Sequence, residues 1–465
     1  SMSSNERKKP SFLFALLIMA AVCVVVIVPY MKWGVSMAAT FFLSWLFVIP
    51  ACMSLGFTYE ELEKAAVSYC GKIITSVFIL LSVGGMIGAW IAAGTVSAIV
   101  DVGLRMITPK IFLLVTFIVG ALYAMACGTS WGTLGTIGIA MSAVGLGLGV
   151  PPAMTAGAVV SAAFLGDGFS PMSDSPNLAS AVTGVKLMDH VRHLAKIQFP
   201  AFIISAVLYT ILGFVYAGGE VQNETTLMII KTLGDNYNVG LIAFLPALIV
   251  IILLLLKKSA IISILISAAT GIGVAVIYQG KSLAYVLTCF WSGVKSDTGM
   301  ELVDTLLSRG GVTSLFSSAS LYLITFGLIG ILTQAGVLDA VVAPIVNKVK
   351  TGFQLLITTI ITGFLGDAVG CSGSFAYLFA GNLMKPLYKK MNVSDLDLTR
   401  NLACSVTPLG PLIPWNMNAV IALDLLGVSC FQYAPYCFQA YVMPVLLIVN
   451  YLLFNKRGGQ QNGEN

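Results

Sequence analysis

The fold is decided by residues 166–177, Gly-Asp-Gly-Phe-Ser-Pro-Met-Ser-Asp-Ser-Pro-Asn. Two glycines and two prolines interrupt a helix there, and two carboxylates, Asp167 and Asp174, stand between the apolar flanks 152–165 and 178–185. A charge inside a bilayer is costly, so an ionisable group within a span is a functional candidate. We therefore predict a broken membrane span whose carboxylates face one cavity. The alternative is an extramembrane turn in which Asp174 caps the following helix.

The whole chain has the composition of a membrane protein. Of its 465 residues, 58% are hydrophobic and 10% are charged, whereas soluble domains carry about 25% charged residues. This argues against soluble enzymes, nucleic-acid-binding proteins and disulfide scaffolds, and no G-x-x-x-x-G-K-[ST] loop for ATP occurs. The candidate spans are 11–30, 35–55, 73–98, the uncharged tract 111–166, 197–217, 238–256, 259–279, 312–335, 351–384, 401–427 and 436–455.

The spans fall into two related halves. Positions 85–98 match the positions 242 residues later at six of fourteen places, which are Gly85/Gly327, Ile87/Ile329, Gly88/Gly330, Ala93/Ala335, Gly94/Gly336 and Ala98/Ala340. Each half crosses the membrane an odd number of times, whether its double segment is a re-entrant hairpin or two full crossings, so a tandem repeat must be inverted. We predict an all-α polytopic membrane protein of two inverted repeats with re-entrant hairpins and Pro/Gly-broken transmembrane helices.

The predicted layout has five parts. They are a cytoplasmic N-terminal tail (1–10), repeat 1 (11–217), an extracytoplasmic linker (218–237), repeat 2 (238–455) and a cytoplasmic C-terminal tail (456–465). If the N-terminus is cytoplasmic, 18 of the 25 Lys and Arg residues fall on the cytoplasmic side, which is the asymmetry typical of inner-membrane proteins. We therefore predict a multi-pass protein of the plasma or inner membrane with both termini in the cytoplasm.

A second interruption lies within the tract 111–166. Its sequence at 128–133, Gly-Thr-Ser-Trp-Gly-Thr, places hydroxyls and unpaired carbonyls at membrane depth, which lipid tolerates only where they line a cavity or bind a ligand. A cation that sheds water needs such oxygens, so we predict sodium ligands at Thr129 and Ser130. The alternative is a close contact between helices rich in small residues.

The second half carries counterparts of both interruptions. Residues 370–374, Gly-Cys-Ser-Gly-Ser, follow Asp367, which is predicted either to bind an ion or proton or to cap a helix end. Residues 407–418, Thr-Pro-Leu-Gly-Pro-Leu-Ile-Pro-Trp-Asn-Met-Asn, carry three prolines and place Asn416 and Asn418 where the first half has acids. The alternative for this segment is a Pro-kinked span with a structural Asn pair.

The predicted ion- or substrate-binding residues are polar side chains from these four segments. They are Asp167, Asp174, Thr129, Ser130, Ser170, Ser173, Asn177, Asp367, Ser372, Ser374, Thr407, Asn416 and Asn418, with Asp174, Thr129, Ser130 and Ser173 as candidate Na+ ligands. Asp424 lacks clustered polar neighbours and is left unassigned. His190 and His193 lie in the basic segment 185–196 and are predicted to face solvent, with a role in pH sensing as the alternative.

The motifs resemble those of a known family. Gly-Thr-Ser-Trp-Gly-Thr at 128–133, Gly-Asp-x-x-Ser-Pro-x-Ser-Asp at 166–174 and Pro-Leu-Ile-Pro-Trp-Asn at 411–416 are similar to signature segments of the NhaC family of sodium/proton antiporters, within the ion-transporter superfamily. The family includes malate/lactate exchangers and sodium-coupled amino-acid carriers, and its fold implies paired hairpins and broken helices that meet near the midplane. Ser175-Pro176 and Met417-Asn418 depart from the family pattern and put the exact substrate in doubt.

Three functions remain open from the sequence. The leading prediction is a secondary transporter, not an enzyme, that exchanges Na+ for H+ by alternating access, with these ions as cargo and no cofactor. The alternative is a Na+-coupled carrier or exchanger of a small organic anion or amino acid, although no buried Lys or Arg is evident to pair with a dianion. An intramembrane aspartyl protease is a remote third. The predicted partners are the lipid bilayer, a small cation and a small organic solute, with no nucleic acid, and a homodimer is left open.

Overall fold

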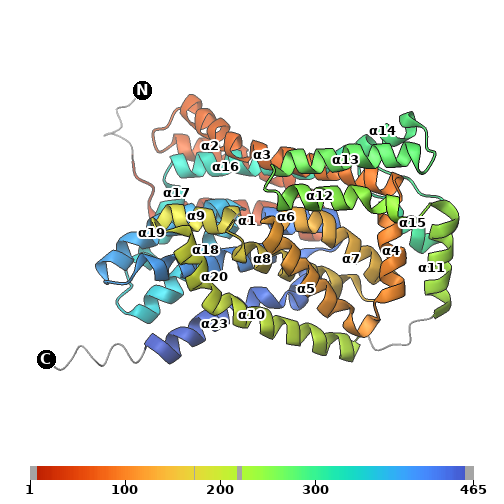
Figure 1. Ribbon diagram of the computed structural model, residues 1–465. Helices are drawn as coiled ribbons and strands as arrows, with labels where there is room; N and C mark the ends of the chain where they lie inside the picture. Colours follow the sequence, from red (N-terminus) through yellow and green to blue (C-terminus); the bar gives the residue numbers. More distant parts are fainter. Residues whose placement is uncertain (1–7, 172, 217–222, 456–465) are drawn as a thin grey trace.

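The computed structural model describes residues 8–171, 173–216 and 223–455, and all regular structure within them is helical (Figure 1). The predicted tails at 1–7 and 456–465, the start of the predicted linker at 217–222 and Met172 lie outside the described residues. The prediction of an all-α protein is confirmed.

The described residues of the first half form ten α-helices and one π-helical turn. They are α1 (Phe12–Trp33), α2 (Met37–Met53), α3 (Tyr59–Ala92), α4 (Thr95–Met106), α5 (Pro109–Cys127), α6 (Ser130–Thr133), η1 (Leu134–Gly138), α7 (Ile139–Gly147), α8 (Pro152–Phe169), α9 (Asp174–Thr183) and α10 (Leu187–Tyr216). The segment predicted as a linker forms the helix α11 (Asn223–Asn236).

The second half follows a similar order. It contains η2 (Leu241–Phe244), α12 (Leu245–Leu255), α13 (Ala260–Ile277), α14 (Leu283–Ser292), α15 (Glu301–Leu307), η3 (Val312–Leu315), α16 (Phe316–Gln334), α17 (Val337–Val346), α18 (Gly352–Gly370), α19 (Gly373–Lys390), α20 (Asp395–Leu409), η4 (Gly410–Leu412), α21 (Met417–Leu426), α22 (Cys430–Tyr433), η5 (Ala434–Tyr436), α23 (Phe438–Asn450) and η6 (Tyr451–Asn455).

Many of these helices are long and apolar enough to cross a membrane. Within the described residues seven single helices meet that test, and the number rises to 11 if each of four bent helix pairs counts as one span. The pair α8 and α9 is bent by 47°, and the pair formed by α20 with η4 and α21 is bent by 46°. These two bends fall on the predicted Pro/Gly breaks, which confirms that the chain is a multi-pass helical protein with broken helices.

Elements in the two halves begin at a constant spacing along the chain. Pro109 and Gly352 open α5 and α18, Pro152 and Asp395 open α8 and α20, and Asp174 and Met417 open α9 and α21, so each pair lies 243 residues apart. Gly128 and Cys371, also 243 residues apart, both have left-handed backbones, with φ of 68° and 54°. The spacing of 242 found in the sequence therefore has a counterpart in the layout of the helices.

Small residues allow the helices to pack closely. The helix α3 runs beside α16, α13 and α14 along one side of the molecule (Figure 1). A Cβ added at Gly88 would lie 2.1 Å from the carbonyl oxygen of Cys289, and one at Gly84 would lie 2.6 Å from that of Gly311. Gly84 and Gly88 thus form a G-x-x-x-G contact, in which backbones approach more closely than larger side chains permit. Similarly, a Cβ at Gly166 of α8 would lie 2.3 Å from the Ala121 oxygen of α5.

Candidate functional site

Four interrupted segments, two from each half, line one open cavity of about 450 Å³. They are the α5–α6 turn, the α8–α9 break, the α18–α19 turn and the α20–α21 break. The predicted site residues that line it are Thr129, Ser130, Asp167, Ser173, Asp174, Ser372, Ser374, Thr407 and Asn418. The sequence motifs therefore meet in space, although they are spread over about 290 residues of chain.

The α8–α9 break holds Asp167, which is the more deeply buried of the two carboxylates at the cavity wall. The helix α8 ends at Phe169, and α9 begins after Ser173, whose hydroxyl accepts the Ser175 backbone N–H at 3.3 Å as an N-cap. Asp167 is 3% exposed, and its Oδ2 accepts a hydrogen bond from Ser175 Oγ at 3.0 Å. The Ser173 hydroxyl and the Ser130 backbone N–H also interact with this carboxylate.

No cation balances the Asp167 charge within the described parts of the chain. The ion pairs there join Arg105 with Asp101, and Asp397 with His193 and Arg400. None of these involves Asp167. A carboxylate removed from water is stabilised by hydrogen bonds, by a bound cation or by a proton. Asp167 thus combines burial, access to a cavity and the absence of a protein counter-ion in the described residues.

Asp174 has a different environment from Asp167. It lies in the first turn of α9 and is exposed, although it also lines the cavity. A carboxylate at this position stabilises the positive end of the helix dipole, but the residue that caps α9 is Ser173 and not Asp174. The exposed Asn177 does not line the cavity, because its Nδ2 donates to the carbonyls of Ser173 and Pro171 at 2.7 and 3.0 Å. Ser170 is fully buried and does not line the cavity either.

The α5–α6 turn presents polar groups from the first hairpin segment. Gly128 closes α5 with a left-handed backbone, and the Thr129 hydroxyl accepts the Gly132 backbone N–H at 3.1 Å. The Trp131 indole donates to Asn418 Oδ1 at 2.9 Å and joins this turn to α21. The π-helical turn η1 follows directly, and such turns are frequent at functional sites. The hydroxyl of Thr129 therefore both caps α6 and lines the cavity.

The second half holds a carboxylate that does not line the cavity. Asp367 is 0% exposed, and Asn416 Nδ2 donates to both its Oδ1 and its backbone oxygen at 3.2 Å. Asn416 Oδ1 also accepts the Asn418 backbone N–H at 3.0 Å and so caps α21. Trp415 Nε1 donates to Ala368 O at 2.6 Å. Asp367 and Asn416 therefore hold the α18–α19 turn against the α20–α21 break.

Several cavity residues were not among the predicted site residues. Ser175 belongs to the 166–177 motif and was noted only as a departure from the family pattern. Tyr377 donates to or accepts from Thr407 Oγ1 at 2.6 Å, but nothing in its local sequence marks it. Lys257 and Lys258, exposed at the α12–α13 turn, line the cavity as well. The prediction that no buried Lys or Arg is available is wrong for Arg400, which is 9% exposed but pairs with Asp397 and does not line the cavity. Lys257 and Lys258 bring cationic side chains to the cavity wall.

The two histidines differ from the prediction in one respect. The prediction that both face solvent is wrong for His190, which is 0% exposed because α8, α9, α20 and α23 pack around α10. His193 is part-buried, and its Nε2 lies 3.0 Å from Asp397 Oδ1 and 3.1 Å from Arg400 Nη1. The unassigned Asp424 accepts a hydrogen bond from the Ser318 hydroxyl and lies apart from the cavity.

Comparison with known proteins gives the family. The model of the Na+/H+ antiporter family matches residues 7–176 and 166–456. The chain belongs to this family. The resemblance to NhaC antiporters is thereby confirmed, and the protein is a transporter and not an enzyme.

Characterised relatives cover most of the chain. It is 33% identical over 408 residues to the malate-2H(+)/Na(+)-lactate antiporter of Bacillus subtilis, and the aligned residues make up 88% of this chain and 87% of that protein. It is 31% identical over 411 residues to the Na(+)/H(+) antiporter NhaC of Alkalihalophilus pseudofirmus (86% and 88%). It is 30% identical over 453 residues to the arginine/ornithine antiporter ArcD of Halobacterium salinarum (96% and 92%). These relatives are named for different solutes, and what they share is antiport.

Proposed function

We propose that this antiporter exchanges Na+ for H+ and that the Asp167 carboxylate binds the two ions alternately. The observation that carries the proposal is a 3%-exposed carboxylate at the wall of an open cavity, with no Lys, Arg or His ion pair in the described residues. Such a carboxylate favours a bound cation or a bound proton over an isolated charge. Exchange follows because occupation by one ion excludes the other.

The surrounding oxygens support sodium as the cation. Hydroxyls of Ser173, Ser175 and Ser130 belong to the segments around Asp167, and the helix interruptions leave backbone carbonyls without helical partners. Hard cations such as Na+ bind oxygen ligands of this kind. Asp174 is exposed and is proposed to act from the outer part of the same site.

Purified protein in liposomes tests this proposal directly. An imposed pH gradient is expected to drive Na+ against its own gradient, and an imposed Na+ gradient is expected to move H+ in the opposite direction. K+ in place of Na+ is the ionic control, and liposomes that carry Asp167→Asn protein are the protein control. The proposal fails if wild-type protein moves neither ion in response to a gradient of the other.

A specific set of observations favours a second candidate, antiport that includes a small organic anion. A volume of about 450 Å³ greatly exceeds what one dehydrated ion fills. Three helices of ten or more residues, α9, α19 and α21, begin at the cavity, and their N-termini favour negative charge. Lys257 and Lys258 add positive charge. The same liposomes, loaded in turn with malate, lactate and arginine, distinguish this candidate by solute-dependent Na+ or H+ movement.

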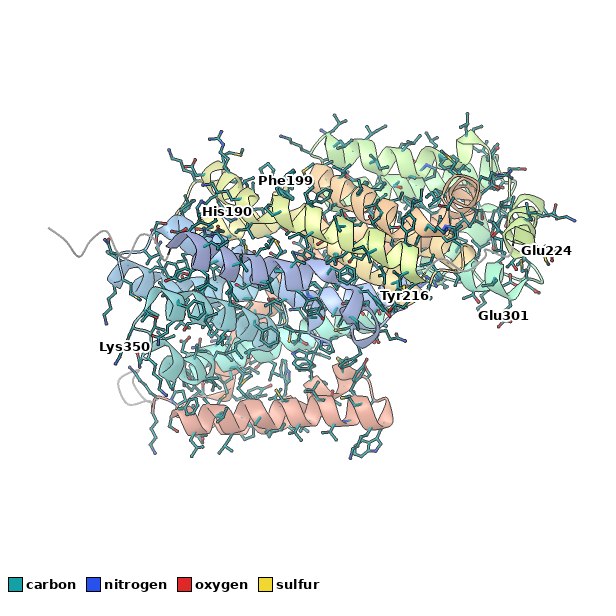
Figure 2. The ribbon with its side chains drawn as sticks, turned by 90° about the horizontal axis from the view of Figure 1, so that it is seen from below. His190, Phe199, Tyr216, Glu224, Glu301 and Lys350 are labelled. Carbon is teal, nitrogen blue, oxygen red and sulfur yellow. The ribbon has the colours of Figure 1, made fainter. Side chains whose placement is uncertain are left out.

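We also propose that the two halves are inverted repeats and that the chain ends face the cytoplasm. The constant spacing of 243 residues between helix starts supports the repeat. Figure 2 supports the orientation, because His190 and Lys350 lie toward one end of the molecule, whereas Glu224 and Glu301 lie toward the other. Single cysteines at positions 192 and 231 of a cysteine-free protein test it. An impermeant thiol reagent should label position 231 and not position 192 in intact cells, and the reverse pattern contradicts the orientation.

A further inference from the structure

A second and much smaller chamber lies behind the ion-binding cavity. Its polar lining comes from α9, α10, α19, α20 and α23, and consists of Ser175, His190, Gln198, Tyr377, Thr407 and Gln439. Ser175, Tyr377 and Thr407 also line the main cavity, so these three residues form a shared wall. The space open to the centre of a water molecule is about 10 Å³, which is close to the minimum that one water requires.

Three buried side chains of this chamber have polar atoms without a partner in the described structure. They are both ring nitrogens of His190, Oε1 of Gln198 and Oε1 of Gln439. Their residues are 0%, 3% and 1% exposed, respectively. Leaving such buried groups without a partner is destabilising, whereas a buried water makes about three hydrogen bonds to groups of this kind. The chamber therefore has both the volume and the ligands for one bound water.

The chamber is connected to the ion-binding carboxylate through Ser175. Ser175 Oγ donates to Asp167 Oδ2 at 3.0 Å and also lines the chamber. The neighbouring wall is the hydroxyl pair of Tyr377 and Thr407, whose oxygens lie 2.6 Å apart. Asp167, the Ser175 hydroxyl, the chamber and His190 thus form a continuous row of groups that can hold or pass a proton.

We propose that His190 and one water in this chamber form a proton path to Asp167 that is separate from the cavity through which sodium enters. When sodium leaves, the water gives a proton to Ser175 Oγ, and the hydroxyl gives its own proton to Asp167. His190 then gives the water the proton of one ring nitrogen and takes a proton from solvent at the other, so the imidazole is uncharged before and after the step and one H+ has passed through it to the carboxylate. An uncharged imidazole is suited to this step because one ring nitrogen donates a proton while the other accepts one.

The charged groups around His190 are mostly engaged elsewhere. On α10 itself the titratable residues nearest in sequence are Asp189, Arg192 and His193, and His193 contacts Asp397 at 3.0 Å. On α5, which also packs against α10, the charged residue is Lys110. On α20, Arg400 pairs with Asp397 at 3.1 Å. On α8 and α9 the acids are Asp167 and Asp174, and α23 carries no charged residue. In the described structure no ion pair stabilises a charged His190 ring, and burial favours the uncharged form.

This inference rests on the proposed Na+/H+ exchange, and paired transport measurements test the two separately. Reconstituted His190→Gln protein is compared with wild type and with His193→Gln, a control on the same helix that does not line the chamber. Two fluxes are measured, which are pH-driven Na+ uptake and Na+/Na+ exchange between equal Na+ concentrations. Only the first requires proton transfer. The solvent isotope effect of each flux in D2O is recorded as well.

We expect His190→Gln to slow pH-driven Na+ uptake by about tenfold or more, since a positioned acid-base group contributes at least that much to proton transfer. Na+/Na+ exchange should stay within twofold of wild type, and the isotope effect on the slowed flux should rise. His193→Gln should retain both fluxes. Equal slowing of both fluxes, or pH-driven uptake equal to wild type, overturns the proton path while leaving the proposed function intact.

A second variant keeps the test decisive if His190→Gln does not fold. Gln439→Leu removes one ligand of the water and leaves His190 and Asp167 in place. It should show the same selective loss of pH-driven uptake, and normal uptake in this variant overturns the proposal. If wild-type protein shows no Na+ flux of either kind, the proposed function itself fails and the proton path falls with it.

Discussion

Asp167→Asn is the substitution that separates ion binding from folding most sharply. The amide has nearly the same size as the carboxylate, and its oxygen can still accept the Ser175 hydroxyl, which lies 3.0 Å from Oδ2. What is lost is one negative charge at a site that is 3% exposed. We therefore expect a folded protein that no longer exchanges Na+ for H+.

The size of the effect follows from burial. Two unit charges about 4 Å apart attract by about 4 kcal/mol at an effective dielectric constant of about 20, and by about 1 kcal/mol in bulk water. The first value applies to Asp167 and corresponds to about a thousandfold weaker Na+ binding. The second applies to the exposed Asp174 and corresponds to about fivefold. Asp174→Asn is therefore the matched control, with the same chemistry seven residues along the chain.

Equilibrium binding of radioactive 22Na+ to detergent-purified protein measures the affinities, and liposome exchange measures the transport. Size-exclusion profiles show whether each variant is folded. In wild type, the apparent Na+ affinity should strengthen with pH by up to about tenfold per unit while protons compete, and then level off. Asp167→Asn should remove this pH dependence. Asp167→Asn binding within threefold of wild type, or equal losses in the two variants, would refute the assignment of the shared site to Asp167.

Two further predictions concern folding. Gly88→Ala should lower the free energy of unfolding in detergent by about 1–3 kcal/mol, because the new Cβ would lie 2.1 Å from a backbone oxygen of α14. The control is Gly71→Ala on the same helix, whose new Cβ meets nothing within 4 Å. It should change the free energy of unfolding by less than about 1 kcal/mol. The backbone N–H of Thr298, at 2.7 Å, holds the pKa of Asp304 below its usual value, with further hydrogen bonds from nearby hydroxyls. A carboxylate with a depressed pKa stabilises the fold above its ordinary pKa of about 4, and this stabilisation is lost as the pH falls through its pKa in the folded protein. Hydrogen-exchange protection of the Thr298 amide should therefore fall at acid pH. In Asp304→Asn the same protection should already be low at neutral pH. Protection that is independent of pH would contradict this.

The sequence could predict where the helices break, because those breaks depend on local chemistry. Glycine adopts the left-handed backbone found at Gly128, and proline cannot continue a helix, so the α5–α6 turn and the α8–α9 break fall where the motifs place them. Hydroxyls next to such breaks cap the new helices, as Thr129 and Ser173 do. These features need only a few neighbouring residues.

The sequence could not predict which acids face the cavity, because burial depends on contacts between distant segments. Asp167, Asp174 and Asp367 all lie in or beside apolar stretches, yet one is enclosed at the cavity wall, one is exposed and one is sealed by Asn416. His190 follows the same rule. The basic residues beside it in the sequence predict a position in solvent, but helices from both halves of the chain bury it.

The two halves use their interrupted helices differently, and this difference supports assigning ion binding to the first half. In the second half, Asn416 joins Asp367 to the start of α21, and the Met417 N–H donates to Cys371 O at 2.8 Å, so the turn and the break are tied together by protein groups. At the equivalent place in the first half stands Ser173, whose shorter hydroxyl caps α9 and leaves Asp167 open to the cavity. Asp367 has no ion pair in the described structure and its Oδ2 has no partner there, so what separates the two acids is access: Asp167 lines the cavity and Asp367 does not. A cation or proton that enters the cavity can therefore reach the Asp167 carboxylate, which is the access that the proposed exchange requires.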